Sequence, residues 1–200
     1  MVSVDLLAAL GKFRNISDRE TDHAYFKTKV PSVAPEAYLN IVYKPAASDI
    51  RAELEKELQL PSALAEFYQQ WNGAHLFLPG FSIYGCIPRN YLICRTDPSR
   101  LLPFNLRELN RECGSQAAKR NLICIGTYSY DGSIVCMRRK SQEIVCYFGE
   151  QFGEERQSWS NLDEWLGEEI SRLSICFDEN GNRLVPKENL LPGPDPSPVN

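Results

Sequence analysis

Histidines and closely spaced cysteines are scarce in this sequence. It has two histidines, His23 and His75, and the closest two of its seven cysteines, Cys86 and Cys94, are eight residues apart. Structural zinc sites need closer pairs such as Cys-x-x-Cys, and a catalytic thiol needs a base or a positive field beside it. We therefore expect no metal site, and an enzyme that uses His75 or Cys86 is the least favoured class of function.

Phosphate-binding glycine motifs and long apolar runs are also missing. No Gly-x-Gly-x-x-Gly or phosphate loop occurs, so the sequence predicts no nucleotide or other cofactor. No run approaches the roughly 20 apolar residues that span a bilayer, and the first residues lack a basic leader with a cleavage site. We expect no membrane association and a cytoplasmic location, where the odd number of scattered cysteines indicates reduced, buried thiols.

Positive charge is in deficit, with a net charge of −4 and a pI near 5.3. Because phosphate contacts require an excess of Lys and Arg, we expect no direct binding to nucleic acid. The charge is also segregated, since residues 150–180 carry nine acids and two bases whereas residues 89–120 carry seven bases and three acids. This segregation either serves solubility and intramolecular pairing or complements a charged protein partner.

Adjacent acidic residues occur three times in the acidic segment, at positions 154–155, 163–164 and 168–169. Such pairs invite comparison with catalytic carboxylates or a cation site. Neighbouring residues on a helix point in different directions, however, so the two carboxylates of a pair do not converge on one point. We expect all three pairs to lie on a solvated acidic face.

A dense apolar pattern at residues 61–72 predicts the helix around which the chain is organised. Its buried face is expected to comprise Leu64, Phe67, Tyr68 and Trp71, at i, i+3, i+4 and i+7. Pro61 suits a first helical turn, and Gly73 suits the left-handed residue that ends a helix. The following apolar residues, 75–78, predict a short strand that enters a turn.

The rest of the chain predicts an α+β fold. Further helices are expected near residues 3–13, with Ser3 as cap, at 48–58, from Asn105 to Gly114, and after a capping box at 160–163. Strands are expected at residues 38–43, 81–86, 91–94, 122–125, 133–137 and 144–148. We predict a single domain with a mainly antiparallel central sheet of about five or six strands and flanking helices. Its expected divisions are an extension at 1–47, the α+β domain at 48–186, and a Pro-rich tail at 187–200.

The helix that reads Leu-Pro-x-x-Leu-x-x-Phe-Tyr from Leu60, closed by Asn72-Gly73 and followed by an apolar strand, resembles the opening signature of the SMI1/KNR4 (SUKH) family. The resemblance extends to the strand at 122–126, to the Asp131-Gly132 turn, and to Trp159 ahead of an amphipathic helix. It implies a SUKH-like fold and a function in binding rather than catalysis. Members of this family serve largely as immunity proteins that neutralise polymorphic toxins by direct contact, while fungal relatives are regulators in cell-wall signalling.

The sequence therefore predicts a non-enzymatic protein-binding domain. The first hypothesis is an immunity protein that neutralises a polymorphic or contact-dependent toxin, with a basic nuclease as one candidate partner. The alternative is a cytoplasmic regulatory or scaffold protein of the SMI1/KNR4 type. The expected partner-binding residues combine aromatic anchors with acids: Tyr128, Tyr130, Asp131, Glu154, Glu155, Trp159 and Asp163.

Overall fold

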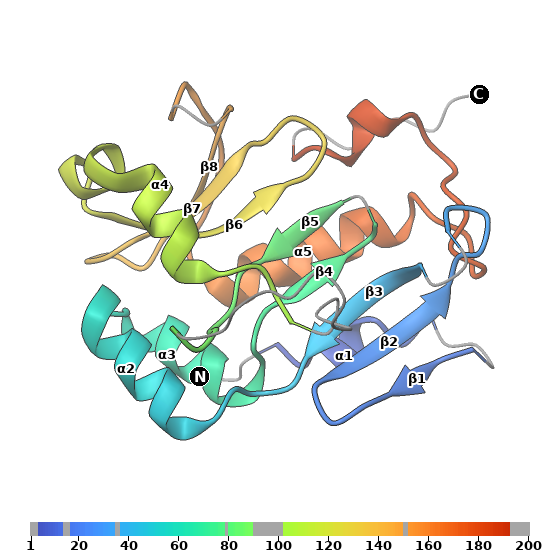
Figure 1. Cartoon of the computed structure of the whole chain (residues 1–200). Coiled ribbons are helices and arrows are strands. Elements are labelled where there is room, and N and C mark those ends of the chain that lie inside the picture. Colours follow the sequence, from blue (N-terminus) through green and yellow to red (C-terminus); the bar gives the residue numbers. More distant parts are fainter. Residues whose placement is uncertain are drawn as a thin grey trace.

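A computed structural model describes residues 4–13, 17–34, 37–78, 80–89, 102–149 and 152–192. Within these ranges the chain forms one sheet of nine strands in the order β1 to β9, with every neighbouring pair antiparallel (Figure 1). The strands are β1 (Arg19–Glu20), β2 (Ala24–Lys29), β3 (Tyr38–Tyr43), β4 (Ala74–Leu76), β5 (Phe81–Ile83), β6 (Leu122–Tyr128), β7 (Ile134–Arg138), β8 (Ile144–Tyr147) and β9 (Glu155–Trp159). The helices are α1 (Leu6–Ala9), α2 (Ser48–Leu58), α3 (Ser62–Gln70), α4 (Leu106–Lys119), α5 (Leu162–Ser174) and the 3-10 helix η2 (Lys187–Leu190).

The antiparallel α+β architecture is as predicted, but the expected number of five or six strands is wrong. Strands β1, β2 and β9 were not expected, because their sequences lack continuous apolar runs. In β2 buried and half-buried residues alternate, and of the three buried residues only Ala24 and Phe26 are apolar. In β9 four of the five residues are polar, and only Trp159 is buried. A strand at the border of a sheet has little hydrophobic signal to reveal it.

The sheet separates two apolar layers. Alternate residues of β6, Ile123 and Ile125, belong to the core cluster that also contains residues of α1, α3 and α5. The intervening residues, Leu122 and Cys124, pack instead with residues of α4 such as Cys113. This alternation places α4 on one face and α5 on the other. The strands β6 to β8 are therefore covered on both sides, as their continuous apolar sequences predict.

The predicted organising helix is α3, which ends at Gln70 rather than at Asn72, and Gly73, with a φ of +87°, lies in the turn that follows. Leu64, Phe67 and Tyr68 are buried, whereas Trp71 lies at the helix end in an extended conformation. A Cβ atom at position 73 would collide with the carbonyl oxygen of Ile83, so only glycine fits there. The chain can thus turn directly from α3 into β4.

Asn72, the residue before this glycine, connects the end of α3 to the segment after β5. Its buried amide nitrogen donates to the carbonyl oxygen of Cys86 at 3.0 Å, and its Oδ1 accepts from the Cys86 amide at 2.6 Å. One side chain therefore satisfies both backbone groups of a buried residue. The Asn-Gly pair thus forms the turn after the helix and anchors the segment that follows β5.

The cap of α4 is as predicted, but the end of that helix and the cap of α5 differ from the prediction. Asn105 caps α4 as predicted, but the helix continues past Gly114, a non-helical residue with φ 38° and ψ −122°, to Lys119. The cap of α5 is Asn161 rather than Ser160, and its Oδ1 accepts from the Glu164 amide at 2.9 Å. The first helix is capped by Asp5. The predicted Ser3 cap, the strand at 91–94 and the tail beyond Pro192 lie outside the described residues.

The six described cysteines are all buried, as their scattered spacing predicts, whereas Cys94 lies outside the described residues. None of the helices in the described ranges has the length and apolar character needed to cross a membrane.

Candidate protein-binding surface

The predicted binding residues fall into two groups at opposite ends of β9. Tyr130, Asp131 and Glu154 lie in the loops that join β6 to β7 and β8 to β9, while Glu155 begins β9. Trp159 ends β9, and Asp163 lies in the first turn of α5. Within the described part of the chain, strand β9 pairs with β8 alone and is the last strand of the sheet. The sheet therefore brings the loop residues together and places the other group one strand length away.

An amphipathic cluster lies at the loop end, and we call it the loop patch: Tyr130, Asp131, Phe148, Arg156 and Lys187. The guanidinium of Arg156 lies 5.0 Å from the centre of the Phe148 ring and is ion-paired with Asp131 at 2.9 Å. The ammonium of Lys187 lies 5.5 Å from the centre of the Tyr130 ring. Phe148 is 56% exposed and Tyr130 is 41% exposed. Exposed aromatic rings that cations hold in place are suited to anchoring a protein partner.

The predicted acids differ in how far they are available to a partner. The side chain of Glu154 is exposed and makes no ion pair with any described residue, whereas Glu155 pairs with Arg138 at 3.0 Å. Asp163 accepts a hydrogen bond from the Val4 amide at 3.1 Å and so ties the start of the described chain to α5. The acidic segment therefore serves intramolecular pairing at some positions and faces solvent at others.

The expectation that all three acidic pairs are solvated is wrong for Glu169, which is buried at 3% exposure, and Asp163 and Glu164 are only half-exposed, whereas Glu168 is exposed. Glu169 accepts two hydrogen bonds from Arg172, at 2.9 Å to Oε1 and 2.7 Å to Oε2. The remaining donors of Arg172 bind the carbonyl oxygens of Asn189 and Leu190 at 3.1 and 3.0 Å. The pair thus fixes the C-terminal segment that contains η2 against α5.

Tyr128 and Trp159, two of the predicted aromatic anchors, are buried. Tyr128 is inaccessible to solvent, and its hydroxyl donates to Glu169 at 2.7 Å and accepts from the indole N–H of Trp165 at 3.3 Å. Burial, together with the Glu169 charge, raises the pKa of Tyr128 well above its usual value, so this hydroxyl remains a donor. Trp159 is 5% exposed and donates its indole N–H to Glu168 at 3.0 Å. These two rings position Glu169 and Glu168.

Burial, which alone would lower the pKa of Arg172, is outweighed by the hydrogen bonds and charge of Glu169, and the pKa is raised. Sequence reasoning missed this pair. A signal was present, because Glu169 lies three residues before an arginine and next to Ile170 on the apolar face of α5. An acid in such a position is buried only with a partner.

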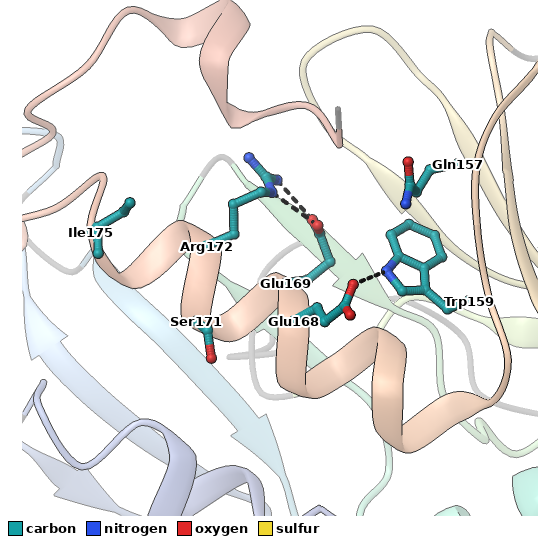
Figure 2. Close-up of a pocket in the computed structure, with 7 residues that line it drawn as sticks. All are labelled: Gln157, Trp159, Glu168, Glu169, Ser171, Arg172 and Ile175. Carbon is teal, nitrogen blue, oxygen red and sulfur yellow. Dashed lines mark hydrogen bonds and ion pairs between the residues drawn. The ribbon is translucent and has the colours of Figure 1, made fainter. Parts of the chain in front are cut away.

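A groove of about 380 Å³ runs between β9 and α5. Figure 2 shows Gln157 and Trp159 of β9 facing the α5 side chains across it. The complete lining is Gln157, Trp159, Glu168, Glu169, Ser171, Arg172 and Ile175. Ile175, at the end of α5, is 61% exposed and gives the groove an apolar end.

The residues considered for catalysis lie elsewhere. His75 is half-buried, with Nδ1 2.8 Å from the Ser82 hydroxyl, and burial lowers its pKa to about 4. Burial raises the pKa of the Cys86 thiol to about 12, which is the opposite of the shift that activates a nucleophilic cysteine. Across the described part of the chain no group of three His, Cys, Asp or Glu side chains is placed to hold a metal ion.

Comparison with known proteins gives one match. A model of the SMI1 / KNR4 family (SUKH-1) matches residues 45–168, which include α2 to α4, β4 to β9 and the first half of α5. Neither a curated protein nor a solved structure matches the chain.

Proposed function

The chain belongs to the SMI1/KNR4 (SUKH-1) family, and we propose that it is a non-enzymatic immunity protein that neutralises a toxin by direct binding. The observation that carries the proposal is the loop patch beside the acidic segment at 152–180. Exposed Tyr130 and Phe148 supply anchors, and Glu154 supplies a charge that no described residue neutralises. Inhibition then proceeds by occlusion of the toxin, without chemistry on the part of the immunity protein.

A partner with a basic surface suits this end of the molecule. Residues 152–180 carry eight acids and two arginines, and both arginines are already ion-paired, with Asp131 and Glu169. Complementary charge speeds encounter and selects orientation, whereas buried aromatic contacts set the lifetime of a complex. A nuclease, which needs positive charge to hold its own substrate, is a toxin class with this property. Of the other predicted acids, Asp131 and Glu155 lie at this end of β9, whereas Asp163 lies at its far end.

The first experiment is a tagged pull-down from source cells with crosslinking and mass spectrometry, at low and moderate salt. A single stoichiometric partner, lost as salt rises and toxic when expressed without this chain, is the expected result. Several substoichiometric partners would instead favour a cytoplasmic scaffold or regulator.

The charge prediction is tested with a Glu154→Lys/Glu155→Lys double variant. We expect its association with the toxin to slow by about tenfold at low salt, with a smaller change in dissociation, because long-range attraction acts on encounter. Stopped-flow kinetics at two salt concentrations measures both rates, and the effect should shrink as salt rises.

The matched control for this charge reversal is Glu108→Lys/Glu112→Lys. It changes the net charge by the same amount at two exposed positions of α4, a helix that contributes no residue to the loop patch. Equal association rates for the two double variants would remove the acidic surface from the proposed mechanism. Thermal unfolding of each variant checks that the fold is intact.

A further inference from the structure

The two edges of the sheet differ in how open they are to another strand. Strand β1 has only two residues, both exposed and charged, which is a common way to protect an edge. Strand β9 has five residues, includes neither proline nor lysine, and forms no backbone hydrogen bond on its outer side with any described residue. Among the described strands, β9 therefore offers the longer free edge.

The hydrogen-bond pattern shows which backbone groups of β9 point outward. The Phe148 amide donates to the Glu154 carbonyl at 3.0 Å, so the amides of Cys146 and Ile144, two and four residues earlier, also face β9. Val145 lies between them, so its N–H and C=O groups face β7. Its partner across the ladder is Ser158. The N–H and C=O groups of Ser158 therefore point away from β8, toward the free edge.

The groove lies directly beside these outward groups. Gln157 and Trp159, the neighbours of Ser158, project into it from β9, and Glu168, Arg172 and Ile175 line it from α5 (Figure 2). Because successive side chains of a strand alternate between faces, a strand added next to β9 would direct every second side chain along this groove. Strand addition of this kind derives affinity from backbone hydrogen bonds and specificity from such side-chain sites.

We propose that an extended segment of the partner, carrying lysine or arginine at alternate positions, adds to β9 as a tenth strand. The charge of the groove is the reason for expecting basic side chains in the added strand. Arg172 is neutralised by Glu169, whereas Glu168 is exposed, and among the described residues only Trp159 bonds it, at Oε2. A cationic side chain in the groove thus meets an acceptor oxygen within an acidic surface. The inference deepens the proposed binding function, on which it rests, by specifying the mode of recognition.

The probe is an acetylated and amidated peptide, Thr-Lys-Val-Arg-Val-Lys-Thr, added to the full chain labelled with ¹⁵N. At saturation the exchange of the Ser158 amide hydrogen is expected to slow by about tenfold or more, because it gains a hydrogen-bond acceptor. The Trp159 amide, which faces β8, should change little and is the internal control. The same peptide with glutamate in place of lysine and arginine should not bind.

Ser158→Pro removes the outward N–H and leaves the hydrogen bonds between β8 and β9 in place, because proline is tolerated where the N–H of an edge strand faces solvent. We expect it to weaken peptide binding by about threefold to tenfold, the value of one hydrogen bond. Ser158→Ala keeps the N–H and is the matched control, with affinity expected to stay near that of the natural chain. Thermal unfolding of both variants verifies the fold.

Three results would overturn the inference: no protection of Ser158 by the basic peptide, equal affinity of the proline and alanine variants, or a Ser158 amide already protected in the chain alone. The last would mean that another part of this chain, or a second copy, covers the edge. Toxin neutralisation is measured separately with the same variants. If Ser158→Pro still protects cells and the peptide has no effect, strand addition fails while the immunity function stands. If no toxin partner exists, the proposed function itself fails.

Discussion

An Arg172→Leu variant is expected to lose about 3–5 kcal/mol of unfolding free energy, the usual cost of breaking a buried ion pair by removing one partner. The substitution leaves the Glu169 carboxylate, only 3% exposed, without the two hydrogen bonds of 2.9 and 2.7 Å that now neutralise it. The Tyr128 hydroxyl, at 2.7 Å, is too weak a donor to replace a guanidinium. Chemical denaturation followed by tryptophan fluorescence measures the loss.

The same variant should also release the C-terminal segment. Arg172 donates to the carbonyl oxygens of Asn189 and Leu190, and these two bonds tie the segment to α5. We expect faster hydrogen exchange and earlier proteolytic cleavage at residues 187–192. Since Lys187 lies over the ring of Tyr130, loss of this anchor should alter the loop patch as well. A segment that remains equally protected would show that Arg172 does not hold it.

The control is the double variant Glu169→Leu/Arg172→Leu. Replacing both members of a buried pair by apolar side chains avoids an unpaired charge, so the double variant should be more stable than either single variant. The remaining cost comes from the Tyr128 hydroxyl, which loses its acceptor, and from the carbonyl oxygens of Asn189 and Leu190, which lose their donors. If the two single losses simply add, the residues are not coupled and the ion pair is not the source of the stability.

The elements that the sequence predicts well are those with dense apolar spacing. The apolar face predicted for α5 is buried at all five positions: Leu162, Trp165, Leu166, Ile170 and Leu173. The continuous apolar runs of β6, β7 and β8 predict covered strands, which the two core layers confirm. Local pattern suffices in these places because each segment buries its own apolar face, whatever covers it.

The parts that escaped prediction depend on distant contacts. Strand β9 is polar because it borders the sheet, and Glu169 is buried because α5 packs on the sheet, although its partner Arg172 is local. Tyr128 and Trp159 lie near polar turns, where exposed aromatics are common, yet each finds a hydrogen-bond acceptor on α5. Their burial follows from how α5 packs on the sheet. No local pattern in β6 or β9 contains that information.

His75 makes stability depend on pH. Its ring is half-buried, with ring centres 4.4 Å from Phe104 and 5.4 Å from Tyr43, and burial lowers its pKa to about 4. In the unfolded chain a histidine has a pKa near 6.5, so between pH 6.5 and 4 the unfolded state binds more protons than the folded state. The contribution of His75 to the free energy of unfolding is therefore fully present above pH 6.5 and declines as the pH falls toward 4. The contribution of this residue amounts to roughly 3 kcal/mol.

Other groups also titrate in acid, so the test compares variants rather than reading one curve. A neutral His75→Gln substitution cannot gain the proton, and its unfolding free energy should fall by roughly 3 kcal/mol less than that of the natural chain between pH 7 and 4. His23→Gln, at an exposed position, is the matched control and should keep the full decline. Denaturation at several pH values gives both slopes. Parallel curves for the natural chain and His75→Gln would mean that the ring accepts its proton in the folded state as readily as in water, and that the packing of Tyr43 and Phe104 does not exclude its charge.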